Sequence, residues 1–298
     1  MIAGLARRRP SVPRLFAVVR RGRGSRAAVR RGAMAVGLAG PLLIAAPAAA
    51  APPAAAPAAR HATASTPILL VHGFDSDFNS AVDCGDRGYI APWVNGMRTR
   101  GFTNVRAVGF YAGDSRCADY VPDRADDTVD TSITELGRDL ANLIYTRYTS
   151  RQQAVAVSAH SMGGLVIRAA LDGVAKRQPG FPARLRVTDV VTSGTPHAGT
   201  RFGTRCAARA AECAQFIPGS RFLTNLGQNP QGVGGTAWTL TGSRRDEYVP
   251  PQSAVAMRRV STTRPAIAKV IYAPYTHVQL VTEPVPLNGI ATGLRTGR

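Results

Sequence analysis

The chain has 298 residues, 45% of them hydrophobic, which is enough for one large packed domain or two small ones. Its net charge of +19 would suit a nucleic-acid-binding protein, but ten arginines lie in residues 1–51, which contain no acidic residue. The rest carries +9 (19 − 10), and its arginines are scattered rather than gathered into a basic stripe. We therefore expect no nucleic-acid partner.

Residues 1–51 have the pattern of an export signal. An arginine-rich start precedes an apolar stretch over residues 33–46 and alanines that offer A-x-A cleavage sites. Arg30-Arg31 fits a twin-arginine signal, and an ordinary secretory signal with a mis-assigned start codon fits equally well. Pro41, Pro47 and the many small residues argue against a permanent membrane span, and no later segment is long and apolar enough to form one. We expect a secreted, extracellular protein without an integral span.

Residues 52–66 are rich in Ala and Pro without periodicity, which predicts a flexible linker. Over residues 67–298, apolar β-rich runs alternate with helical patterns, so we expect a single α/β domain with a mostly parallel sheet. Strands are expected at 68–71, 105–111, 154–157, 187–192, 238–241 and 266–272, and helices at 128–148 and from the Gly-Gly at 163–164 to about Lys176.

Four cysteines suit an oxidising compartment and allow three pairings. We favour Cys84–Cys117 and Cys206–Cys213, because each pair lies in or beside loop-like sequence. The alternative, a zinc site, lacks any C-x-x-C or closely spaced Cys/His pattern.

The sharpest motif is Ala-His-Ser-Met-Gly at residues 159–163, which follows an apolar strand and precedes a helical pattern. It is a G-x-S-x-G nucleophile elbow with alanine in its first position. A turn this tight requires small residues two before and two after the serine, whose hydroxyl then projects above the sheet. We predict Ser161 as a nucleophile, with the N–H of Met162 donating to an oxyanion.

A serine nucleophile needs a base and an acid, which in enzymes with such an elbow follow the serine in the chain order Ser, Asp/Glu, His. His277 lies just beyond the last expected strand, whereas the other histidines lie in the linker, in early turns or beside the serine (His61, His72, His160, His197). Asp246, in a loop after a strand, is the expected acid. Glu247 is adjacent and could substitute. The loop after the first strand should supply a second oxyanion donor, the N–H of Phe74.

Together with Val-His-Gly-Phe at 71–74 and Gly-Thr-Pro-His-Ala-Gly at 194–199, these motifs resemble the secreted bacterial lipases and esterases of the α/β-hydrolase superfamily, in particular actinobacterial triacylglycerol lipases. The resemblance covers about residues 67–283, and the elbow is similar to that of the small Bacillus lipases. It implies an α/β-hydrolase fold and cofactor-free hydrolysis of a small acyl ester or lipid through an acyl-serine, with transient contact to a lipid interface possible. The chain is longer than those minimal lipases and carries cysteines.

The extra length falls mainly between Thr200 and Thr236, where it could form an acyl-binding wall or a plain core-packing insertion. Residues 75–79 begin like a calcium loop, but the sixth position is Ser80 and the twelfth Asp86, so we expect no metal. Two other functions fit the same motifs: acyl transfer to a cell-envelope alcohol, and a catalytically silent binding protein on this fold.

Overall fold

The computed structural model describes residues 61–85, 88–260 and 267–298. The expected signal segment and most of the expected linker therefore lie outside the described residues. The domain is built on a seven-stranded parallel sheet with strand order β3-β2-β1-β4-β5-β6-β7. Its strands are β1 Ile68–Val71, β2 Val105–Gly109, β3 Asp119–Tyr120, β4 Val155–His160, β5 Val187–Ser193, β6 Ala237–Ser243 and β7 Ile267–Tyr272. This confirms the expected α/β class.

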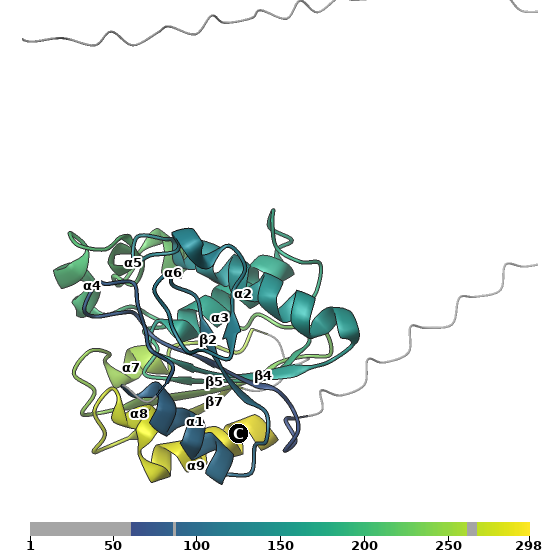
Figure 1. The fold of residues 1–298 in the computed structure, drawn as a ribbon. Helices are drawn as coiled ribbons and strands as arrows, with labels where there is room; N and C mark the ends of the chain where they lie inside the picture. Colours follow the sequence, from purple (N-terminus) through teal and green to yellow (C-terminus); the bar gives the residue numbers. More distant parts are fainter. Residues whose placement is uncertain (1–60, 86–87, 261–266) are drawn as a thin grey trace, which may run out of the picture. The chain divides into compact units, whose positions relative to one another are not determined.

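Helices cover both faces of the sheet (Figure 1). The described helices are α1 Ile90–Thr99, α2 Ile133–Arg147, α3 Gly163–Ala175, α4 Arg201–Cys206, α5 Ala211–Gln215, α6 Arg221–Asn225, α7 Pro251–Ala254, α8 Gln279–Thr282 and α9 Pro284–Thr296, with 3-10 turns at Arg124–Asp126 and Thr149–Arg151. One hydrophobic core lies under α2 and α3, and the other lies under α1 and α9. None of the helices in the described stretches is long and apolar enough to cross a membrane.

The inner strands are buried along nearly their whole length because both faces of the sheet are covered. Every residue of β1 and β4 is buried, as expected for parallel strands between two helical layers. The helix α2 begins at Ile133, later than the predicted start at residue 128, because Ser132 and Glu135 form a capping box. The strand β2 ends at Gly109 instead of Tyr111, because the Phe110 and Tyr111 amides bind the Asp114 carboxylate.

The packed domain begins earlier than residue 67. The amide of Ala62 donates to Leu294 O and to the Asp189 carboxylate, each at 3.0 Å, and His61 Nδ1 lies 2.6 Å from Asp189 Oδ1. The last residues of the expected linker are therefore held against β5 and α9, where they supply two hydrogen-bond partners to the buried Asp189 carboxylate.

Both predicted disulfides are present, Cys84–Cys117 and Cys206–Cys213, with Cα–Cα distances of 4.8 Å and 5.6 Å. The first joins the loop after β1 to the loop after β2. The second joins α4 to α5.

Candidate active site

The predicted site residues all follow the carboxyl ends of strands. Ser161 follows β4, Asp246 follows β6 and His277 follows β7, while Phe74 lies in the loop after β1. In a parallel sheet these ends share one edge, which is where open α/β sheets bind ligands.

Ser161 occupies a strained turn between β4 and α3. Its φ of 55° lies in the left-handed region that non-glycine residues rarely adopt. A Cβ at Gly163 would lie 2.2 Å from His72 O, and one at Gly164 would lie 2.0 Å from Thr195 Oγ1. Both positions must therefore be glycine, which is the steric cause of the motif. The turn places Ser161 at the amino end of α3, where the helix dipole favours negative charge.

His277 and Asp246 form a direct pair. His277 Nδ1 lies 2.8 Å from Asp246 Oδ2, and the Asp246 side chain is fully buried. The other Asp246 oxygen accepts the amides of Tyr248 and Val249, both at 2.9 Å. Glu247 binds the backbone N–H of His277 at 3.1 Å instead of its ring. Of the two adjacent acids, Asp246 therefore holds the imidazole and Glu247 holds the loop that carries it.

One cavity of about 210 Å³ is lined by Ser161, His277, Phe74 and Met162. The side chain of Ser161 makes no hydrogen bond to any described residue. Nucleophile–base hydrogen bonds are often long before substrate binds. Nor do the amides of Phe74 and Met162 donate to a described acceptor. Both residues line the cavity, and neither of their N–H groups has a partner among the described residues.

Aromatic rings form much of the cavity wall. Phe74 lies between Phe78 and Phe216, with ring centroids 5.4 Å and 5.9 Å away. Phe202 of α4 stacks on Phe216 at 6.4 Å and meets Tyr248 edge-on at 5.3 Å. The insertion between Thr200 and Thr236 thus lines the cavity through Phe202 and Phe216. Its other apolar side chains, including Leu223 and Leu226, pack into the core below α2 and α3, so the insertion both lines the cavity and packs into the core.

The remaining histidines have partners of their own. His61 pairs with Asp189, His72 with Asp114, and His197 Nε2 lies 3.0 Å from Thr192 Oγ1. His160 Nε2 donates to the carbonyl of His277 at 3.1 Å, and the two rings lie 4.5 Å apart. Burial, followed by the nearby His277, holds the pKa of His160 well below its ordinary value, so this ring stays neutral beside the predicted base.

Two cavity-lining side chains were missed from the sequence. Tyr89, at the start of α1, accepts the Gly73 amide on its hydroxyl at 3.1 Å. The sequence placed His160 only beside the serine, although its hydrogen bond fixes the His277 backbone. No sequence signal marks either contact, because both join segments that are distant in the chain.

The residues 75–79 serve a structural purpose. The carboxylate of Asp75 accepts the amides of Asp77, Asn79 and Ala81 at 3.0, 2.8 and 3.3 Å. Within the described residues no group of three or more His, Cys, Asp or Glu side chains is arranged to hold a metal ion.

Residues 122–228 match a protein family described as "Putative serine esterase (DUF676)". The matched segment contains Ser161 but neither Asp246 nor His277. No curated protein sequence matches the chain.

Among solved structures, the chain is similar to Aspergillus fumigatus lipase B, with a TM-score of 0.53 and 15% identity over 77% of this chain. It spans only about half of that lipase, 52% of its length. For Bacillus licheniformis lipase BlEst2 the TM-score is 0.49 and the sequence identity 13%, and the match covers 80% of this chain and 95% of that lipase. For Bacillus subtilis carboxylesterase CesB the TM-score is 0.47 and the sequence identity 14%, and the match covers 80% of this chain and 86% of that enzyme. The chain has the α/β-hydrolase fold.

Proposed function

We propose that the chain is a serine hydrolase that cleaves acyl esters through an acyl-serine intermediate. The observation that carries this proposal is the strained Ser161 at the floor of a cavity shared with His277, whose ring is held by the buried Asp246. The family match over residues 122–228 supports the same chemistry. The aromatic wall favours an apolar acyl chain, so lipase or carboxylesterase activity is the form we propose.

In this mechanism His277 Nε2 takes the proton of Ser161 as its oxygen attacks the ester carbonyl. The amides of Phe74 and Met162 bind the oxyanion, and Asp246 keeps the Nδ1 proton in place. The alcohol leaves with the proton that His277 returns. Water then attacks the acyl-serine with the same base and releases the acid.

The test is hydrolysis of p-nitrophenyl esters, from C2 to C16, by residues 52–298 and by the Ser161→Ala variant. We expect the variant to lose about 10³-fold or more in kcat, as removal of a triad nucleophile does elsewhere. The chain-length optimum then separates esterase from lipase. Activity that survives in the variant would refute the role of Ser161. If the unmodified chain cleaves no ester, the proposal itself fails.

We also propose that the protein is exported, with residues 1–51 removed. Two disulfides among the described residues support an oxidising compartment. Recovery of the intact amino terminus from a cell that expresses the gene would contradict this, whereas an extracellular product starting near residue 52 would support it.

A further inference from the structure

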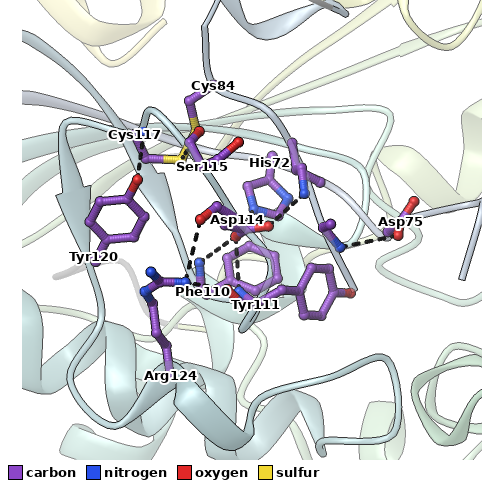
Figure 2. Close-up of polar contacts among 12 residues, drawn as sticks. His72, Asp75, Cys84, Phe110, Tyr111, Asp114, Ser115, Cys117, Tyr120 and Arg124 are labelled. Atoms are coloured by element: carbon purple, nitrogen blue, oxygen red, sulfur yellow. Dashed lines mark hydrogen bonds and ion pairs between the residues drawn. A yellow bond between two sulfur atoms is a disulfide. The ribbon is translucent and has the colours of Figure 1, made fainter. Parts of the chain in front are cut away.

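A second buried His–Asp pair, His72 and Asp114, lies beside Phe74 and involves the loop after β1 that carries this predicted oxyanion donor. His72 Nε2 lies 2.9 Å from Asp114 Oδ2, and both side chains are essentially inaccessible to solvent (Figure 2). The His72 ring stacks on Phe110 with centroids 3.9 Å apart. None of these residues takes part in the mechanism above, so the pair needs another explanation.

The protonation of this pair follows from its partners. Asp114 accepts three backbone amides, from Val82 at 2.7 Å, Phe110 at 2.7 Å and Tyr111 at 2.9 Å. Although burial alone would raise the pKa of Asp114, the His72 charge and these hydrogen bonds lower it below its ordinary value. An ionised carboxylate only accepts, so His72 Nε2 donates to it. His72 Nδ1 lies 2.8 Å from Gly73 O, which also only accepts. The bond that holds the Gly73–Phe74 peptide is therefore a donation from His72 Nδ1 to Gly73 O.

The bond to Gly73 O determines where the next amide points. The described chain has no cis peptide, and in a trans peptide the C=O and the following N–H point in opposite directions. Because Gly73 O faces the buried His72 ring, the Phe74 N–H of the same peptide faces away from it, toward the cavity that Phe74 lines. The Gly73 N–H is held separately by the Tyr89 hydroxyl. Both peptide groups that flank Gly73 are thus fixed by side chains.

The Asp114 loop is itself tightly held. Arg124 Nη1 donates to the carbonyls of Tyr111 and Ala112 at 3.0 and 2.7 Å. The amides of Cys84 and Ser115 bind Ser115 O and Val82 O, at 2.9 and 3.0 Å, beside the Cys84–Cys117 disulfide (Figure 2).

From this arrangement we propose that His72 and Asp114 are positioning residues that hold the Phe74 amide toward the oxyanion. This inference rests on the proposed ester hydrolysis. It assigns the Asp114 loop and the adjacent Cys84–Cys117 disulfide a role in transition-state binding, although Asp114, Cys84 and Cys117 do not line the cavity.

Two substitutions that introduce an amide side chain test the two hydrogen bonds of His72 one at a time. In His72→Asn the side-chain NH2 replaces Nδ1 and can reach Gly73 O, whereas in His72→Gln it replaces Nε2 and can reach Asp114. Each variant loses one buried hydrogen bond, so general destabilisation affects both. His61→Asn and His61→Gln are matched controls, because they alter the His61–Asp189 pair, which lies near the amino end of β5.

The readout is the ratio of kcat/KM for an ester to kcat/KM for its thionoester. The concentration of active enzyme is measured by fluorophosphonate titration, so that unfolded molecules do not contribute. Sulfur is a poorer hydrogen-bond acceptor than oxygen, so the ratio reports oxyanion binding. Loss of a whole oxyanion donor costs about 10²–10³ in kcat. We expect His72→Gln to lower the ratio by about tenfold or more, mainly through kcat, and His72→Asn to lower it less.

An unchanged ratio in His72→Gln, with an active unmodified chain, would overturn the inference alone. An equal fall in the His61 variants would do the same, since it would show a general structural effect. If the unmodified chain cleaves neither ester, the proposed function fails and the inference fails with it. Should neither His72 variant fold, Cys84→Ser/Cys117→Ser acts on the same loop. A fall in the ratio there supports the inference, and an unchanged ratio overturns it.

Discussion

At the scale of single residues, the candidate site depends on a glycine that leaves room for the predicted acid and base. Gly194 follows β5 with φ of 62°, and a Cβ there would lie 3.0 Å from Asp246 Oδ2 and from the His277 ring. The predicted acid and base therefore pack directly on this glycine. The sequence shows a Gly-Thr-Pro-His turn, but only the fold reveals that its glycine touches Asp246 and His277.

Gly194→Ala should reduce kcat by about 10²-fold or more, because a displacement of about 1 Å in a catalytic group has an effect of that size. Gly234→Ala is the control, since Gly234 also has a positive φ, of 87°, and a Cβ added there would meet nothing within 4 Å. Both changes should destabilise the fold by about 1–2 kcal/mol through backbone strain. Ester hydrolysis and thermal unfolding of the two variants check this. Equal losses of activity would contradict it.

At the scale of elements, the sequence predicts those helices, strands and turns whose local residue pattern agrees with the structure they adopt. The inner strands, α2, the elbow and the disulfide pairing follow from apolar runs, from glycine spacing and from loop composition. The helix α9 was missed, because its Pro284, Pro286, Gly289 and Gly293 imitate a loop. Pro at the start of a helix is permitted. A Cβ at Gly289 would lie 2.1 Å from the Tyr272 hydroxyl, so close packing on the sheet explains this glycine.

The disulfide between α4 and α5 should influence acyl selectivity. Cys206→Ser/Cys213→Ser removes a short loop closure worth about 2.5 kcal/mol, and Phe202 and Phe216 of the cavity wall flank that loop. We expect a lower Tm and a shifted optimum across the C2–C16 ester series. In Cys84→Ser/Cys117→Ser the Tm should fall while the optimum stays in place. A lower Tm with an unmoved optimum in the first variant would make the α4–α5 segment a packing element only.

At the scale of the whole molecule, the domain encloses a carboxyl group that no sequence pattern indicated. Glu212 is fully buried, accepts the Tyr111 hydroxyl at 2.6 Å on one oxygen, and has no partner among the described residues for the other. Burial raises the pKa of Glu212 well above its ordinary value. The Tyr111 hydrogen bond opposes this, and Asp127, Asp130 and Asp75 add to it. Composition places such a residue on the surface, and only the assembled core places it inside.

The contribution of Glu212 to stability should therefore fall as pH rises from the pKa of Glu in the unfolded chain toward the raised pKa in the folded chain. The folded chain keeps the Glu212 proton at pH values where the unfolded chain has released it, so unfolding releases a proton and becomes easier with increasing pH. Glu212→Gln can still accept from Tyr111 and has no proton to release. Urea unfolding at pH 5, 6 and 7, above the pKa of Glu in the unfolded chain, should show the variant gaining up to about 1.4 kcal/mol per pH unit over the unmodified chain. Parallel pH profiles would show that Glu212 is ionised in the folded protein.

The contact between His61 and Asp189 also fixes where the amino end of the domain lies relative to the cavity. His61 and Gly297 meet beside Ala237, at the amino ends of β5 and β6. The cavity opens at the carboxyl ends of the same strands. A fusion partner, affinity tag or solid support joined to either end of the domain is therefore connected at the edge of the sheet that faces away from arriving substrate.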